Sequence, residues 1–378
     1  MPTRHKESVT FTVVVSVVAA LAAVPMAVLL IIAGEPAAVV VATLLALVPV
    51  PVLIACYLWL DRYEPEPRSL LASGLAWGAF VATLGALVVQ GVGGWFAGWS
   101  DEQSLAIVAP LTEEATKGAF LMLLVIWKRA EFDGVLDGIV YAGMVGIGFA
   151  FTENILYLIA AWNGGGEGIP DGLAGVTATF VVRCLVSPFA HPLFTAFIGI
   201  GLGLAVSSRS RAARVLLPLG GYALAVLLHG IWNASTLVED GLGFLLSYVV
   251  LMVPTFVVMI GIAVWVRTRE PVLLARALDD AARLGLIAPS DIPYVVDLGA
   301  RRRARAVARA HGGAAGAAAM RDYQQAAVEL GYLHHRVLRG TAPANHVERG
   351  QMFVDRMHHI RPYTPFPAPM SPAGGRHR

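Results

Sequence analysis

The sequence predicts an all-α fold: a polytopic membrane helix bundle of about eight transmembrane helices, followed by a C-terminal cytoplasmic helical domain. Composition is the first observation behind this prediction, because 57% of the 378 residues are hydrophobic and only 14% are charged, with a mean hydropathy of +0.66. The second is that apolar residues come in runs of membrane-spanning length. These features are typical of a multi-pass protein of the cell membrane, whose surroundings are the lipid bilayer.

The predicted spans follow from length, because a helix needs about 20 apolar residues to cross the hydrocarbon core. Eight spans fill a transmembrane bundle of residues 1–266, and they run approximately over residues 10–33, 37–60, 69–92, 104–127, 134–162, 174–206, 214–236 and 242–266. The fifth is rich in glycine, which lets neighbouring helices approach closely. Pro188 and Pro192 lie in the sixth, so we expect it to be kinked or broken near its centre.

Charges in the loops predict the orientation, because basic loops alternate with acidic ones along the chain. The basic residues are Arg62, Arg68, Lys128, Arg129, Arg209, Arg211 and Arg214, and the acidic ones include Glu35, Asp101 and Glu102. By the positive-inside rule, both termini are cytoplasmic, which requires an even number of spans. The same charge balance carries no signal of nucleic-acid binding, so no nucleic-acid partner is expected.

Beyond residue 266 the composition changes and helical patterns of mixed polarity take over. Residues 267–362 are therefore predicted to form a small cytoplasmic helical domain. The last stretch, residues 363–378, is rich in Pro, Gly and Arg and is predicted to be disordered.

The fourth span carries Glu113, Glu114 and Lys117 in its middle. Charge at bilayer depth costs several kcal/mol per residue unless it is paired or hydrated, so such a cluster is a functional-site hypothesis by default. On a helix Glu113 and Lys117 share one face at i and i+4, whereas Glu114 points about 100° away. One carboxylate can therefore be paired while the other remains free for chemistry.

Three further spans bring polar groups to a similar depth. The residues are Glu153 and Asn154 in the fifth, Arg183, Ser187, His191 and Thr195 at every fourth position of the sixth, and His229 and Asn233 in the seventh. Glu113 and Glu153 each lie about nine residues from the outer end of their span, and His229 about seven. At about 1.5 Å per residue, these groups fall in the outer half of a roughly 30 Å core and can meet in one layer.

Such groups either hold the bundle together as hydrogen-bonding contacts between helices or perform chemistry. Two His, three Glu, an Arg and a Lys exceed what packing requires, and carboxylates with imidazoles are suited to general acid–base catalysis on a water molecule. The chain has no His-Glu-x-x-His pair, no Gly-x-Gly-Asp motif and no Gly-x-Ser-x-Gly elbow. What remains is a site built from Glu, His and Asn.

Four segments then identify a family. In order and spacing, the chain resembles the PrsW family of intramembrane proteases, distant relatives of the type II CAAX prenyl proteases. The motifs are Glu113-Glu-Ala-Thr-Lys117, Phe149-Ala-Phe-Thr-Glu-Asn154, His191-Pro-Leu-Phe-Thr195 and His229-Gly-Ile-Trp-Asn233. The resemblance covers about residues 40–266 and leaves out the cytoplasmic part.

The resemblance implies an intramembrane endopeptidase that cuts membrane-anchored proteins such as anti-sigma factors. By similarity to the CAAX relatives, Glu113 or Glu114 with a histidine, His191 or His229, would activate the attacking water. His229 with Asn233 would stabilise the oxyanion. The supporting residues would be Lys117, Glu153, Asn154, Arg183 and Thr195.

The mechanism and the function each leave an alternative open at this stage. His191, His229 and Glu113 could bind zinc with one open position, so a metal-dependent mechanism stands beside a glutamic one without metal. A proton-coupled transporter is the rival function, since buried Glu, His and Arg also form proton relays, although the spans contain no inverted repeat. A third alternative is a non-catalytic scaffold whose working part is the tail.

Overall fold

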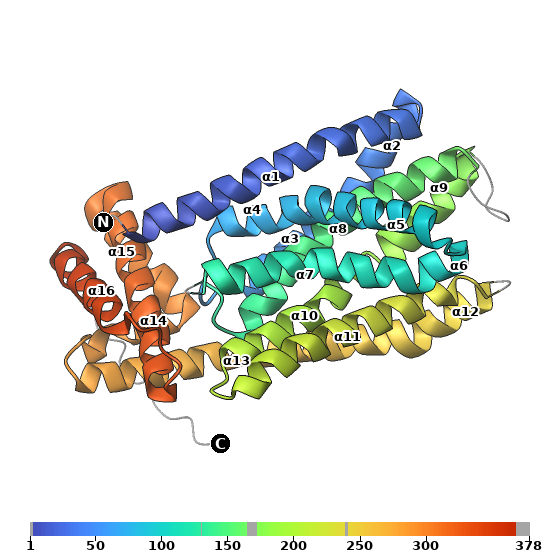
Figure 1. The fold of residues 1–378 in the computed structure, drawn as a ribbon. Coiled ribbons are helices and arrows are strands. Elements are labelled where there is room, and N and C mark those ends of the chain that lie inside the picture. Colours follow the sequence, from blue (N-terminus) through green and yellow to red (C-terminus); the bar gives the residue numbers. More distant parts are fainter. Residues whose placement is uncertain (1–2, 130, 165–171, 239–240, 368–378) are drawn as a thin grey trace, which may run out of the picture. The chain divides into compact units, whose positions relative to one another are not determined.

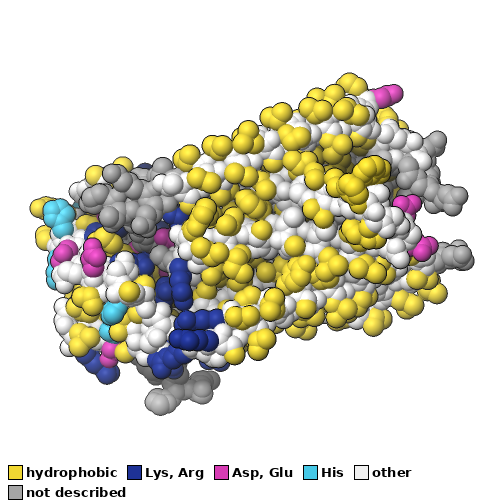
Figure 2. Space-filling model, viewed as in Figure 1, with side chains coloured by type: hydrophobic (Ala, Val, Ile, Leu, Met, Phe, Trp, Pro, Cys, Tyr) yellow, Lys and Arg dark blue, Asp and Glu magenta, His cyan; other side chains and the backbone are white. Residues whose placement is uncertain are grey.

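The protein is described here by a computed structural model that covers residues 3–129, 131–164, 172–238 and 241–367. These residues form helices and connections without any β-strand, so the predicted all-α class is confirmed. Figure 1 shows a bundle of long helices that run roughly parallel or antiparallel to one another. On the visible face, hydrophobic side chains cover the length of this bundle, and acidic side chains lie at its α6 end (Figure 2).

Within the described residues, seven helical segments are long and apolar enough to cross a membrane. They are Thr10–Ala33 in α1 (Thr3–Ala33), Pro36–Leu60, Arg68–Ala97, Val135–Trp162, Gly172–Val206, Arg211–Ser235 and Leu242–Arg283. The remaining predicted span, residues 104–127, corresponds to α7 (Ala109–Trp127) and the π-helical turn Ser104–Val108 that precedes it. Its three central charges separate it from the other seven by composition, and α7 nevertheless lies inside the bundle, between α5 (Thr83–Ala97) and α11 (Arg211–Ser235) (Figure 1).

Prolines divide two of the spans. The sixth breaks as predicted: α9 (Gly172–Phe180) and the π-helical turn Val181–Val186 end before Pro188, and α10 (Ala190–Val206) begins after it. Pro192 falls in the first turn of α10, where a missing N–H costs nothing. The second span is also divided, at Pro49, into α2 (Pro36–Leu47) and α3 (Val50–Leu60).

Helix α8 (Val135–Trp162) is the centre of the bundle, and its glycines explain how closely its neighbours approach. A Cβ added to Gly138 would lie 2.1 Å from the carbonyl oxygen of Gly199 on α10. A Cβ on Gly146 would lie 2.6 Å from the backbone nitrogen of Pro192, beside His191. Backbone-to-backbone contact between α8 and α10 therefore depends on glycine and fixes the position of the His191 segment.

The bundle continues through α4 (Arg68–Ala76), which a π-helical turn joins to α5, and through α6 (Asp101–Gln103), α12 (Leu242–Leu246) and α13 (Val253–Arg283). By its contacts the chain divides into two compact units, residues 1–264 and 265–378. The sequence placed the corresponding boundary at 266, which falls inside the continuous helix α13.

The second unit contains the end of α13, α14 (Pro293–Val296), α15 (Leu298–Arg339) and α16 (His346–Ile360). Leu278, Tyr323 and Phe353 belong to its apolar core. Of the segment predicted to be disordered, residues 368–378 lie outside the described part of the chain, whereas Phe366 packs edge-on against Tyr323.

Candidate active site

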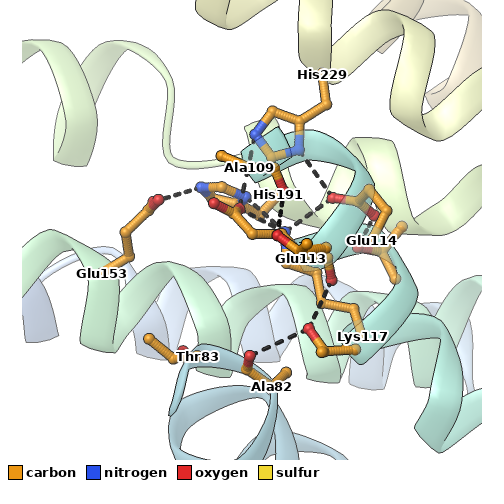
Figure 3. A network of polar contacts seen from close by, with 12 residues as sticks. Ala82, Thr83, Ala109, Glu113, Glu114, Lys117, Glu153, His191 and His229 are labelled. Carbon is orange, nitrogen blue, oxygen red and sulfur yellow. Dashed lines mark hydrogen bonds and ion pairs between the residues drawn. The ribbon is translucent and has the colours of Figure 1, made fainter. Parts of the chain in front are cut away.

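Lys117 is the centre of the polar network inside the bundle. Its side chain is fully buried, and its ammonium nitrogen Nζ donates to Glu114 Oε1 at 2.8 Å and lies 3.4 Å from Glu113 Oε2. The same nitrogen lies 3.0 Å from Nδ1 of His191 (Figure 3). It also lies 3.8 Å from the ring centroid of Phe149. A buried cation is tolerated here because it is paired with carboxylates and further solvated by an aromatic face.

Glu114 is enclosed on every side. One oxygen, Oε2, accepts the hydroxyl of Thr195 at 3.0 Å, and the other accepts from Lys117 and from Nδ1 of His229, the latter at 3.1 Å. The residue has no exposed surface. Glu114 therefore fixes its partners in place and has no open side for a substrate.

A second carboxylate, Glu153 on α8, orients His191. Its Oε2 lies 2.6 Å from Nε2 of His191, and the guanidinium of Arg183 forms an ion pair with it. Arg183 also donates from Nε to Oδ1 of Asn154 at 2.8 Å and stacks on the ring of Tyr157. Arg183 lies in the π-helical turn Val181–Val186, a local irregularity that is frequent at functional sites.

These contacts determine the tautomers of both histidines, because a carboxylate accepts and an ammonium donates. His191 carries its proton on Nε2, facing Glu153, and accepts at Nδ1 from Lys117. His229 carries its proton on Nδ1, facing Glu114, and its Nε2 lies 3.7 Å from Glu113 Oε2. Each imidazole is thus held by one carboxylate and turns its unprotonated nitrogen inward.

The arrangement fits a metal ion. Glu113, His191 and His229 each offer one ligand atom, and these atoms lie within 4.8 Å of one another. Two imidazoles and a carboxylate are a common zinc-binding set, and a carboxylate on the far nitrogen of each ligating histidine is the usual support. Lys117 lies beside His191 Nδ1, so that nitrogen either accepts from the ammonium or binds a metal.

A cavity of about 370 Å³ opens beside the network. Of the predicted site residues, Glu113, Glu153 and Asn233 line it. Asn233 donates from Nδ2 to the backbone carbonyl of Leu105 at 3.0 Å, within the π-helical turn before α7. At its far end the cavity reaches Asp101 at the start of α6.

The structure brings the predicted residues together. Hydrogen bonds and ion pairs join nine of these residues into one network, and Asn233 lines the cavity; the nine are Glu113, Glu114, Lys117, Glu153, Asn154, Arg183, His191, Thr195 and His229. Sequence reasoning missed the contribution of the third span, whose Thr83, Ala86 and Gln90 line the cavity wall. Gln90, a lone amide in an apolar run, was the only signal that pointed there.

Comparison with known proteins gives a consistent picture. Residues 66–259 match the model of a family described as "PrsW family intramembrane metalloprotease". Protease PrsW of Geobacillus kaustophilus (strain HTA426) is 30% identical over 186 residues, which cover 49% of this chain and 74% of that protein. Protease PrsW of Clostridioides difficile (strain 630) is 25% identical over 196 residues, covering 50% and 77% respectively.

Protease PrsW of Bacillus subtilis (strain 168) is 32% identical over 141 residues, which cover 37% of this chain and 57% of that protein. No solved structure matches the chain. The family match lies within the helix bundle and does not reach the second unit. The resemblance predicted from the four motifs is therefore confirmed, and the chain belongs to the PrsW family of intramembrane proteases.

Proposed function

We propose that this protein hydrolyses a peptide bond of membrane-anchored proteins, of the kind represented by anti-sigma factors, with Glu113 as the residue that activates water. The observation that carries the assignment is the difference between the neighbouring carboxylates. Glu113 lines the cavity, whereas Glu114 is enclosed by Lys117, His229 and Thr195. A general base needs access to the proton that it removes.

His229 is placed to share this proton. Its unprotonated Nε2 faces Glu113 Oε2 at 3.7 Å, while its Nδ1 proton is held by Glu114. In the proposed step, the water loses one proton to Glu113, which passes it on to Nε2 of His229, and the water oxygen attacks the carbonyl carbon. The same proton is returned to the nitrogen of the leaving amine when the C–N bond breaks.

Stabilisation of the oxyanion falls to Asn233 and, after proton uptake, to His229. One amide hydrogen of Asn233 is used by the Leu105 carbonyl, which leaves the second for the cavity. His229 has no proton on Nε2 in its resting tautomer, so it donates to an oxyanion only once it has taken the proton from water. The Lys117 ammonium, paired with Glu113 and Glu114, adds a fixed positive charge to the site.

Metal dependence is a second form of the same proposal, supported by the ligand set of Glu113, His191 and His229. The family description also names a metalloprotease. A divalent metal bound there would polarise the water and the carbonyl group. With Glu113 engaged as a ligand, Glu153 is the carboxylate that still faces the cavity.

The substrate is argued from the cavity walls and its opening. Ala86, Ala109, Leu105 and Leu156 give it a mostly apolar surface of small and medium side chains, suited to an apolar peptide segment in extended form. Its α6 end is lined by Asp101, the first residue of that helix. We propose that both termini are cytoplasmic, as the loop charges predict, which places this opening on the outer side of the cell membrane.

The test is cleavage of a single-span reporter by purified protein in proteoliposomes. Glu113→Gln is expected to lower the single-turnover rate by a factor on the order of 10² to 10⁴, the usual contribution of a general base. Glu102→Gln is the matched control, because Glu102 is exposed in α6 and does not line the cavity. Equal rates for Glu113→Gln and wild type would contradict the assignment of the base.

A chelator arm separates the two forms of the mechanism. Loss of activity after chelation, restored by zinc, supports the metal-dependent form. Activity that survives chelation but not Glu113→Gln supports a water activated by glutamate alone. Proteolysis would be contradicted if neither the wild type nor Glu113→Gln cleaved any of a panel of reporters. Solute flux in the same vesicles would then support transport instead.

A further inference from the structure

A groove separates α3 from α4 at the end of the bundle where the loop Asp61–Pro67 connects them. Both helices pack on α8 and make few contacts with each other. The space between them has a volume of about 610 Å³, within the roughly 300–1,000 Å³ range of ligand pockets. Its walls are apolar, with Leu58 from α3, Leu71 and Leu75 from α4, and Met144 of α8.

Two arginines line the loop end of this groove. Arg62 follows α3 and Arg68 begins α4, and both side chains are exposed. Within the described part of the chain, neither guanidinium forms an ion pair or a side-chain hydrogen bond. Their positions at the ends of two membrane-spanning helices place them at the level of lipid headgroups.

Two carboxyls also line the groove, but both are buried and already bonded to neutral donors. Asp61 Oδ2 accepts the backbone N–H of Glu66 at 2.9 Å, and Glu66 Oε2 accepts the hydroxyl of Tyr141 at 2.6 Å. Burial raises the pKa of Asp61 to about 7 and the pKa of Glu66 well above its usual range. At neutral pH these carboxyls therefore offset the two arginines only in part.

We propose that the groove is a binding site for an anionic phospholipid, with an acyl chain between α3 and α4 and the phosphate held by Arg62 and Arg68. The apolar walls match the chain, and the positive mouth matches the headgroup. A basic pocket between transmembrane helices at the cytoplasmic surface is the usual form of such a site. Helix α8 contributes Met144 to the groove and Glu153 to the cavity, but apart from α8 the two sites are lined by different segments, so the proposal does not depend on the proposed chemistry.

The test is native mass spectrometry of the full chain, released from nanodiscs that contain equal amounts of phosphatidylglycerol and phosphatidylcholine. The wild type is expected to retain phosphatidylglycerol preferentially. A basic residue near an anionic headgroup contributes on the order of a fivefold preference, so Arg62→Ala with Arg68→Ala should remove a preference of roughly 25-fold. Arg211→Ala with Arg214→Ala removes the same charge from another basic loop and should leave the preference unchanged.

A second variant tests the apolar part of the site without changing charge. Ala72 is exposed in α4 and lines the groove, so Ala72→Trp should reduce retention of both lipids there. The proposal is overturned if the wild type does not retain phosphatidylglycerol in preference to phosphatidylcholine. It is equally overturned if the two double arginine variants lose this preference to the same extent. It is also overturned if Ala72→Trp blocks reporter cleavage while lipid retention stays at the wild-type level, because the groove then receives a protein segment.

Discussion

Two clusters of buried or largely buried carboxyls in the bundle are stabilised by different means. Glu113, Glu114 and Glu153 are surrounded by cationic or imidazole partners, among them Lys117 and Arg183. Asp61 and Glu66, at the loop between α3 and α4, are hydrogen-bonded instead to a backbone N–H and a tyrosine hydroxyl. Each cluster satisfies the rule that buried polar groups need partners, but only the first uses opposite charge.

The difference separates a site that keeps charge available from one that keeps carboxyls protonated. Opposite charges beside a buried carboxylate favour its ionised form, as Lys117 does beside Glu114 and Arg183 beside Glu153. Neutral donors compensate burial less, and the raised pKa values of Asp61 and Glu66 show this. The first cluster, or α7 cluster, therefore has the properties of a catalytic centre. The second, the loop cluster of Asp61 and Glu66, has those of a structural connection between α3 and α4.

Removal of Lys117 tests this comparison most severely. Lys117→Met leaves Glu114 fully buried without its cation, and breaking a buried pair costs about 3–5 kcal/mol in the free energy of unfolding. Denaturant unfolding in mixed detergent micelles measures the loss. Because the site positions His191 and His229 through the same network, reporter cleavage should be lost as well.

A double variant distinguishes an unpaired charge from a packing defect. Lys117→Met combined with Glu114→Gln removes both charges and should recover a large part of the lost stability, without recovering cleavage. If the double variant instead loses the sum of the stability losses of the two single variants, Lys117 and Glu114 do not stabilise each other. The first cluster would then not be stabilised by opposite charge, and it would not differ from the second in this respect.

The site around α7 shows most clearly which features could be predicted from the sequence and which could not. The depths of Glu113, Glu153 and His229 along their helices sufficed to predict that they share one layer, because residues on neighbouring spans can be compared by rise per residue. The same geometry showed that Glu113 and Glu114 face different ways. It did not show which one faces the cavity, since this depends on the rotation of α7 against α5 and α11.

Other features depend on tertiary contacts that leave no pattern. Lys117 has carboxylates at both i−4 and i−3, and only packing decides that Glu114, at 2.8 Å, is nearer than Glu113, at 3.4 Å. Ala86 lines the cavity, yet in sequence it resembles any other apolar residue of a span. The role of Glu66 was hidden for the same reason: its partner Tyr141 lies 75 residues further along the chain.

The loop cluster should respond to pH in a direction that its raised pKa values determine. Asp61 loses its proton near pH 4 when unfolded and near pH 7 when folded, because burial raises its pKa from 3.8 to about 7. Between these values the unfolded state binds fewer protons, so Asp61 lowers stability progressively as pH rises, and the effect is constant above pH 7. Asp61→Asn removes this contribution.

Asp61→Asn is therefore expected to match the wild type near pH 4 and to exceed it at pH 8 by on the order of 4 kcal/mol, because the pKa of Asp61 rises from 3.8 to about 7 on folding. Unfolding midpoints of both proteins, measured in detergent between pH 4 and pH 8, give the difference. A gain that is the same at every pH would show that the pKa of Asp61 does not change on folding, and would place it with ordinary exposed loop carboxyls.

The smallest expected effect is the difference in stability between removing a buried tyrosine hydroxyl and removing an exposed one. Tyr141→Phe removes the hydroxyl that bonds Glu66 at 2.6 Å and should cost about 1 kcal/mol in the free energy of unfolding, since the carboxyl that remains is buried. Tyr222→Phe is the control, because its hydroxyl donates to the Leu111 carbonyl at 2.8 Å in an exposed position. Exposed substitutions usually change stability by less than about 0.5 kcal/mol. Equal costs would mean that water replaces the Tyr141 hydroxyl, and that the loop cluster is hydrated through the groove beside it.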